Sequence, residues 1–160
     1  MAYAPDKIDL KILSLLQQSA QRSINEIAEA VGLSNSPCWS RIQKLEEAGY
    51  IRARVCVLDG RKLGLKLTGF VHVKASEHDL NWMERFSVVV RERPEVTEFY
   101  RITGDWDYLI KVVLPDVEAY DRFYKAVQRK VPLKDVSASF SIEEIKYTTT
   151  VPLETPTEGI

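Results

Sequence analysis

Apolar residues in the first third of the chain recur every three to four positions, which is the spacing of amphipathic helices. A first stretch over 6–19 begins at Asp6, a residue type that caps helix N-termini, and carries isoleucine and leucine on one face. A second stretch over 24–31 ends at Gly32, which interrupts the pattern. A third follows at once over 36–48. We therefore predict three short helices, the last two joined by a tight turn.

The third predicted helix, over 36–48, has an apolar and a polar face. Ser34 or Ser36 can cap its first amide groups, and Gly49 can end it. Its inward stripe is expected to contain Cys38, Ile42, Leu45 and Ala48. Its outward face is expected to carry Asn35, Ser36, Trp39, Ser40, Gln43 and Lys44, with Arg41 beside them. The expected DNA contacts are seven residues: Asn35, Ser36, Pro37, Trp39, Ser40, Arg41 and Lys44.

This outward face has the chemistry of a surface that enters a DNA groove. Amides and hydroxyls pair with base edges, and cations meet phosphates. A solvated helix surface is the alternative, because many helix pairs have a polar outer face. Trp39 favours binding, since a large aromatic side chain is unusual on a purely solvated face. Both interpretations stay open at this point.

Residues 50–58 alternate between apolar and other side chains, which predicts a strand that forms a wing or a dimer ribbon. Residues 59–66 hold two glycines and three cations and are interpreted as a linker. The expected organisation is a helix-turn-helix domain with its following strand over 1–58, that linker, a second domain over 67–151 and an extended tail over 152–160.

Beyond residue 66 the pattern changes to strands that alternate with helices. Strands are predicted over 67–75, 96–103, 106–114 and 136–147, and helices over 79–93 and from Asp116 onward. The order β-α-β-β-α-β predicts an α+β ferredoxin-like sandwich, with both helices on one face of four antiparallel strands. Since Phe140 and its neighbours cannot all face the helices, the open sheet face is expected to pair with a second subunit.

The chain of 160 residues is 45% hydrophobic and 28% charged, as ordinary folded proteins are. Its net charge of -1 argues against strong non-specific binding to nucleic acid. Residues 1–62 carry nine Lys/Arg against seven Asp/Glu, a balance of +2, whereas residues 63–160 carry thirteen against sixteen, a balance of -3. This asymmetry points weakly to the N-terminal part as the nucleic-acid side.

No apolar run reaches the roughly 20 residues of a membrane span. The first residues lack the apolar core of a signal peptide. We therefore expect a cytoplasmic protein with no membrane partner.

The sequence gives little support to catalysis. Its two histidines, His72 and His78, have no nucleophile or carboxylate arrangement beside them, and Cys38 and Cys56 lack metal-ligand spacing. We therefore expect no enzyme, no metal and no cofactor. A small-molecule-binding or enzymatic ferredoxin-like protein without a role in gene regulation is the alternative, but it leaves the N-terminal helices unexplained.

Four motifs occur in order along the chain: DKIDLKIL, VGLSNSPCWSRIQKLEEAGYI, RITGDWDYLIKV followed by PDVEAY, and SFSIEEIKYTT. Through them the sequence resembles, from Asp6 to about Pro152, the leucine- and asparagine-responsive regulators of the Lrp/AsnC, or feast/famine, family. The resemblance implies a sequence-specific transcriptional regulator of amino-acid metabolism, with a winged helix-turn-helix and a C-terminal effector-binding and oligomerisation domain. Its implied partners are double-stranded DNA, copies of itself in a dimer and an octamer, and a small amino acid.

Carried onto this sequence, the resemblance places the recognition helix at 36–48 and the effector loop at 103–108. The loop glycine would offer backbone groups to an amino acid, and Asp107, or secondly Asp105, would receive its ammonium group. From the residues alone, Gly104 and Asp105 would be only a tight hairpin turn. The expected ligand-binding residues are Tyr100, Thr103, Gly104, Asp105, Trp106, Asp107, Ser137 and Ser139.

The effector is suggested by a narrower resemblance. The PCW of the recognition helix and the KYTT near the C-terminus resemble regulators that respond to cysteine and control its breakdown. Cysteine is therefore the candidate effector.

Overall fold

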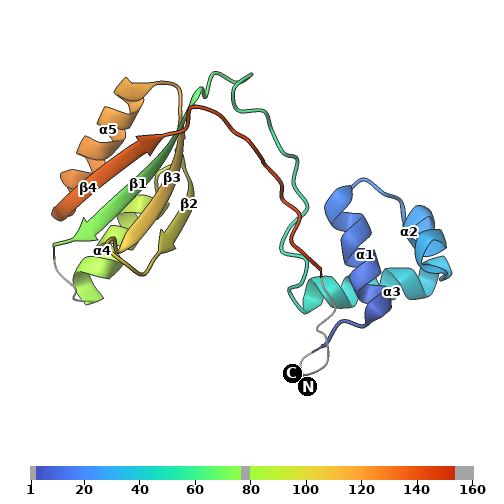
Figure 1. Cartoon of the computed structure of the whole chain (residues 1–160). Helices are drawn as coiled ribbons and strands as arrows, with labels where there is room; N and C mark the ends of the chain where they lie inside the picture. The colour runs from blue at the N-terminus through green and yellow to red at the C-terminus, as the bar shows by residue number, and fades with distance from the viewer. Residues whose placement is uncertain (1–2, 77–79, 154–160) are drawn as a thin grey trace. The chain divides into compact units, whose positions relative to one another are not determined.

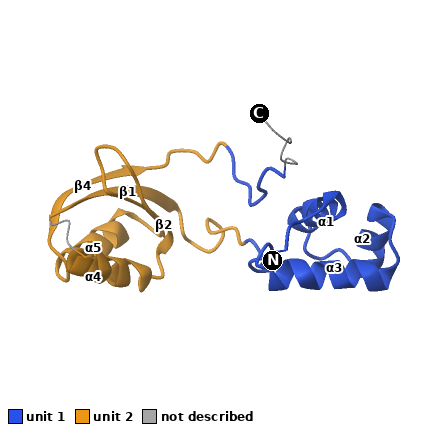
Figure 2. Cartoon of the chain, turned by 90° about the horizontal axis from the view of Figure 1, so that it is seen from below, with its two compact units in different colours: residues 1–57, 146–160 blue, residues 58–145 orange. Residues whose placement is uncertain are grey.

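The computed structural model describes residues 3–76 and 80–153, which form two compact units (Figure 2). The first unit holds Met1–Val57 together with Lys146–Ile160, and the second holds Leu58–Ile145. The expected boundary at 151 differs from this grouping, because the segment from Lys146 onward belongs to the first unit. Residues 154–160 of the expected tail lie outside the described ranges, as do His78 and Asp79, where a helix is expected to begin. No helix in the described ranges is long and apolar enough to cross a membrane.

Three helices build the first unit: α1 (Lys7–Gln18), α2 (Ile24–Val31) and α3 (Asn35–Glu47) (Figure 1). Asp6 caps α1 as predicted, because its carboxylate accepts hydrogen bonds from the backbone N–H groups of Ile8 and Asp9. Gly32 ends α2 with a φ of 72°, a left-handed conformation that favours glycine. The helices enclose a small core of Ile12, Ile27, Ala28, Cys38, Ile42 and Leu45.

Two details at the ends of α3 differ from the prediction. Ser34 occupies the N-cap position but makes no side-chain capping hydrogen bond, and the helix begins one residue early, at Asn35. Ala48 is exposed rather than part of the buried stripe. The reason is that α3 ends at Glu47 and the chain turns at Gly49, whose φ is 78°.

The strand predicted over 50–58 is wrong for the single chain, because these residues form no strand. A strand needs a neighbouring backbone to satisfy its N–H and C=O groups, and no described segment pairs with this one. Val55, Val57 and Leu58 consequently expose 73%, 58% and 72% of their surfaces. The wing or dimer ribbon stays a prediction.

The second unit is a sheet of four antiparallel strands in the order β2-β3-β1-β4, with both helices on one face (Figures 1 and 2). Its elements are β1 (Leu67–Ala75), α4 (Leu80–Arg91), β2 (Val96–Arg101), β3 (Tyr108–Leu114), α5 (Val117–Gln128) and β4 (Leu133–Phe140). Asp116 caps α5 through the N–H of Ala119, at 2.7 Å. The predicted α+β class and the βαββαβ ferredoxin-like sandwich are confirmed.

Phe140 corrects the argument about the open sheet face. Its ring meets Tyr120 of α5 with centroids 5.1 Å apart, so Phe140 faces the helices, and β4 ends there rather than at 147. The side chains of opposite parity line the open face. In β1, Val71 and Val73 are buried under the helices, whereas Phe70 lies on the open face and is 37% exposed.

Candidate functional site

The outer face of α3 is polar and largely free. Six of the seven predicted DNA-contact residues are exposed: Asn35, Ser36, Pro37, Trp39, Ser40 and Lys44. Trp39 exposes 49% of its surface, although Cys38 beside it is completely buried. The Asn35 side chain donates a hydrogen bond to the side chain of Asn25 in α2 and remains exposed.

Arg41 differs from these six residues because its guanidinium group is already paired. Its Nη1 donates to Asp6 Oδ2 at 2.7 Å and to Asp9 Oδ1 at 2.9 Å. These hydrogen bonds raise the pKa of Arg41, that with Asp9 contributing most. Arg41 is therefore not the free surface cation that the sequence pattern indicates.

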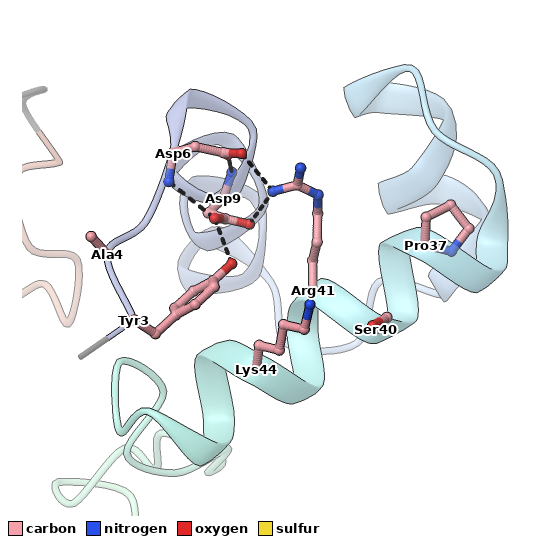
Figure 3. Close-up of a pocket in the computed structure, with 8 residues that line it drawn as sticks. All are labelled: Tyr3, Ala4, Asp6, Asp9, Pro37, Ser40, Arg41 and Lys44. Atoms are coloured by element: carbon pink, nitrogen blue, oxygen red, sulfur yellow. Dashed lines mark hydrogen bonds and ion pairs between the residues drawn. The ribbon is translucent and has the colours of Figure 1, made fainter. Parts of the chain in front are cut away.

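Asp9 is the centre of this network (Figure 3). It is 1% exposed, and its Oδ2 accepts from the Tyr3 hydroxyl at 2.7 Å and from the Asp6 backbone N–H at 3.0 Å. The Tyr3 carbonyl in turn accepts from the Tyr50 hydroxyl at 2.9 Å. The network thus joins the segment before α1, the first turn of α1, the middle of α3 and the turn after α3.

The network shifts the ionisation of its members. Burial, followed by the hydrogen bond to Asp9, raises the pKa of Tyr3 to about 12. The Asp9 backbone N–H and then Arg41 lower the pKa of Asp6. A cavity of about 350 Å³ beside the network is lined by the carboxylates of Asp6 and Asp9 and by the cations of Arg41 and Lys44. These charges balance, so the cavity has no net positive charge to bind a phosphate.

The predicted effector loop connects β2 and β3 through residues 102–107, which is longer than the tight turn expected at Gly104 and Asp105. Gly104 has a φ of 111°, a backbone conformation that residues other than glycine rarely adopt. Thr103, Gly104 and Asp105 are exposed. The loop therefore presents backbone groups and one carboxylate to solvent.

Asp107 anchors the loop to β1. Its Oδ2 accepts from the Ala75 backbone N–H at 2.9 Å, and its own N–H donates to the Val73 carbonyl at 3.1 Å. Its carbonyl accepts from the Ile102 N–H, which closes the loop. Among the described residues Asp107 Oδ1 has no partner, so one oxygen of this carboxylate can still accept an ammonium group.

Trp106 lies with two residues of β1 that the sequence pattern does not single out as ligand-binding. Its ring is 5.8 Å from the His72 ring, and Lys74 Nζ lies 5.4 Å from its centroid. His72 and Lys74 alternate with buried valines in β1, and this alternation is the signal that places them on the open face beside the loop. They add two polar groups to the candidate effector site.

The remaining predicted ligand residues lie on the open face at different distances from the loop along the strands. Ser137 of β4 is paired with His72, which places it near Trp106, whereas Ser139 is paired with Phe70, two positions further along β1. Tyr100 of β2 donates its hydroxyl to Glu98 at 2.8 Å. Within the described ranges no group of three His, Cys, Asp or Glu residues could hold a metal.

The chain combines a helical unit that exposes a polar helix with a ferredoxin-like unit that carries an exposed polar loop. The winged helix-turn-helix DNA-binding profile matches residues 5–52, and the Lrp/AsnC ligand binding domain profile matches residues 68–151. The chain belongs to the Lrp/AsnC family of transcriptional regulators. The prediction of a DNA-binding regulator that is not an enzyme is therefore confirmed.

Relatives support this membership along nearly the whole chain. The DNA-binding transcriptional activator DecR of Escherichia coli K12 is 48% identical over 150 residues, which are 93% of this chain and 99% of DecR. The glutamate uptake regulatory protein of Zymomonas mobilis is 47% identical over 148 residues, covering 92% of this chain and 90% of that protein.

Two solved structures share the fold at substantial identity. An AsnC family transcriptional regulator from Agrobacterium tumefaciens is 51% identical, with a TM-score of 0.89 and coverage of 93% of this chain and 97% of that one. A transcriptional regulator from Neisseria meningitidis in complex with L-methionine is 34% identical, with a TM-score of 0.88 and coverage of 94% and 97%.

Proposed function

We propose that this protein is a sequence-specific, homo-oligomeric regulator of amino-acid metabolism whose assembly or DNA affinity changes when a small amino acid binds at residues 103–108. The observation that carries the DNA part is the exposed polar face of α3, which holds Trp39 and Lys44 opposite a fully buried stripe. A dimer would set two such helices in successive major grooves of a pseudo-palindromic site.

In this proposal the exposed residues of α3 divide into two roles. The amides and hydroxyls of Asn35, Ser36 and Ser40 read base edges, with Pro37 and Trp39 in contact with the groove. Lys44 meets a backbone phosphate. Arg41 acts differently because its charge is compensated by Asp6 and Asp9.

A lysine variant tests the phosphate contact. Lys44→Ala is expected to weaken binding at every salt concentration and to reduce the slope of log K against log salt by about 1, since one fewer counterion is released. Binding is measured by fluorescence anisotropy on a duplex selected from a random pool by the wild-type protein. Lys130→Ala, which removes the same charge from an exposed turn of the second unit, is the matched control. An unchanged slope in Lys44→Ala would remove this residue from the interface.

The effector part rests on the chemistry of an α-amino acid, which needs an acceptor for its ammonium, donors for its carboxylate and a shaped wall for its side chain. Asp107 Oδ1, and secondly Asp105, would accept the ammonium group. The carboxylate would be bound by backbone N–H groups around Gly104. The other groups proposed for the site are Tyr100, Thr103 and Trp106, together with the hydroxyls of Ser137 and Ser139 on β4.

A thermal-shift screen against the twenty amino acids tests this site, because a ligand that binds the folded state raises the melting temperature. At 100 times its dissociation constant a ligand adds about 2.7 kcal/mol of stability, enough for a shift of several degrees. Asp107→Asn is expected to abolish the shift. Asparagine keeps an acceptor for the Ala75 N–H but removes the charge that binds ammonium. A shift that survives in this variant would place the ligand elsewhere.

We propose cysteine as the effector, on the resemblance of PCW and KYTT to cysteine-responsive regulators. Serine is the matched comparison in the screen, because it differs only in having a hydroxyl in place of the thiol. The L-methionine complex of the Neisseria relative supports a sulfur-containing amino acid in a protein of this fold. A shift with another amino acid and none with cysteine would reject cysteine while leaving the effector site intact.

We also propose that the open face of the sheet pairs with a second subunit and that dimers associate into an octamer. Phe70 supports this pairing, since an exposed phenylalanine in a central strand leaves apolar surface uncovered. The functional segments in this proposal are a DNA-binding domain over 1–58, a linker over 59–66, an effector and assembly domain over 67–151 and a tail over 152–160.

A further inference from the structure

We infer that Asp9 is a positioning residue for the recognition helix α3, and that Arg41 links Asp9 to this helix rather than contacting a DNA phosphate. The inference rests on the proposed DNA-binding function of α3. Helical spacing places Asp9 on the same face as Ile12 and Leu16, but the sequence does not show what compensates its carboxylate. The partners of Asp9 in the structure do.

The buried carboxylate of Asp9 is compensated from three directions. Arg41 Nη1 binds Oδ1, and the Tyr3 hydroxyl and the Asp6 N–H bind Oδ2, all within 3.0 Å. A charge at 1% exposure is stable only when it is paired and hydrogen-bonded. The three donors therefore constrain one another, because a shift of any of them leaves the carboxylate undersatisfied.

The same contacts make Arg41 a poor phosphate ligand. Its Nη1 lies between two carboxylates, so the group Asp6, Asp9 and Arg41 carries a net charge of -1. A phosphate brought to this guanidinium would meet the half-exposed Asp6, whose lowered pKa keeps it charged. Lys44, which is exposed and has no such partner among the described residues, is the cation that remains for phosphate.

Two polar contacts then hold α3 in place beside α1 and the segment before it. Asp9 and Arg41 join the helices at the middle of α3, and the Tyr50 hydroxyl binds the Tyr3 carbonyl just beyond its end. The buried stripe of α3 supplies attraction, but apolar contact is not directional and leaves the rotation of a helix loosely defined. Directional bonds to Asp9 restrict α3 to one setting.

Loss of this restriction lowers DNA affinity without removing a DNA contact. If only a fraction of the molecules hold α3 in the competent setting, the apparent dissociation constant rises by the inverse of that fraction. Losing one charge-assisted hydrogen bond of this kind is expected to lower the apparent affinity for DNA about tenfold. The number of phosphates neutralised in the complex stays the same, so the salt slope does not change.

Asp9→Asn in the full chain tests the inference on the same selected duplex, at temperatures well below the melting point of each variant. We expect binding to weaken about tenfold at every salt concentration, with the wild-type slope. Simple electrostatics predicts the opposite sign, because removing a negative charge from this unit would tighten DNA binding. Affinity equal to or tighter than that of the wild type overturns the inference.

Arg41→Gln and the double variant Asp9→Asn with Arg41→Gln identify the link. We expect Arg41→Gln to keep the wild-type slope, and we expect the double variant to bind no more weakly than either single variant, because both remove the same connection. A slope reduced by about 1 in Arg41→Gln, or losses that multiply in the double variant, would show that Arg41 contacts DNA independently of Asp9.

Tyr3→Phe keeps the inference testable if Asp9→Asn does not fold, because it removes only one hydroxyl donor. We expect a smaller loss, about threefold, with an unchanged slope, and wild-type affinity would contradict the inference. Wild-type DNA binding and Lys44→Ala test the proposed function separately. Suppose that the wild-type protein binds DNA, that Lys44→Ala reduces the salt slope, and that Asp9→Asn and Tyr3→Phe bind with wild-type affinity. The DNA-binding function would then stand, and only the positioning role of Asp9 would be rejected.

Discussion

Tyr3 illustrates how much a residue before the first helix contributes to the first unit. Its hydroxyl donates to the buried Asp9, and its carbonyl accepts from Tyr50, so one residue bonds to the first turn of α1 and to the turn after α3. The helical pattern predicts Asp6 as a cap but gives no indication of a role for Tyr3. Tyr3 lies six residues before Asp9, and side chains on one face of a helix are three or four residues apart, so helical spacing does not predict this hydrogen bond. The sequence therefore shows the cap and misses the network built on it.

The ionisation of Tyr3 predicts a loss of stability at high pH. Its pKa is raised from 10.0 to about 12, since burial and Asp9 favour the neutral phenol, with Asp6 acting in the same direction and Arg41 opposing. A group whose pKa is raised on folding stabilises the fold fully below its unfolded pKa, and this contribution is lost as pH rises through the folded value. Stability is therefore expected to fall between pH 10 and about 12.

The measurement is denaturant unfolding across that pH range, with Tyr3→Phe as the control. Phenylalanine has no proton to lose, so the difference in unfolding free energy between wild type and variant should shrink as pH rises. A difference that stays constant from neutral pH to about 12 would contradict the role given to the Tyr3 hydroxyl.

At the scale of elements, the features encoded locally could be predicted and those that need a distant partner could not. Asp6, Gly32 and Asp116 mark helix ends by short-range capping chemistry, and all three do so in the structure. The alternation over 50–58 satisfies the same kind of local rule, but no strand forms because no other described segment pairs with it.

The effector loop shows the same limit. The Gly104–Asp105 pair suggests a two-residue turn, yet the strands end at Arg101 and begin at Tyr108. The difference arises because Asp107 bonds to the end of β1, which lies more than 30 positions earlier, and the loop is pulled out of the β2–β3 ladder. The loop position is thus predictable from the sequence, whereas its shape and the neighbours His72 and Lys74 depend on tertiary contacts.

At the scale of the whole molecule, each unit depends on contacts beyond its own apolar core, made by other parts of the chain or by other copies. A three-helix unit of about 50 residues has a small core and needs support beyond it. The polar network around Asp9 supplies part of this support, and the side chain of Gln17 adds two hydrogen bonds with the backbone of Val151, at 3.0 and 3.1 Å. In the second unit the exposed Phe70 shows that the open face of the sheet is left uncovered within the single chain.

A regulator of this kind responds to an effector only if the effector binds two assembly or DNA-binding states with different affinity. The two units place the parts of that linkage on separate elements, α3 for DNA and the 102–107 loop for the ligand. Family membership establishes a DNA-binding regulator with a ligand-binding domain. We propose that amino-acid binding at this loop is coupled to DNA binding by α3.

The most direct test is fluorescence anisotropy of the wild-type protein on its selected duplex, with and without the amino acid that gives the largest thermal shift, and with a scrambled duplex as control. We expect tight binding to the selected sequence, weaker binding to the scrambled one, and a change of about 5- to 150-fold in affinity when the amino acid is present. Equal binding to both duplexes, or an affinity that the amino acid leaves unchanged, would contradict this proposal.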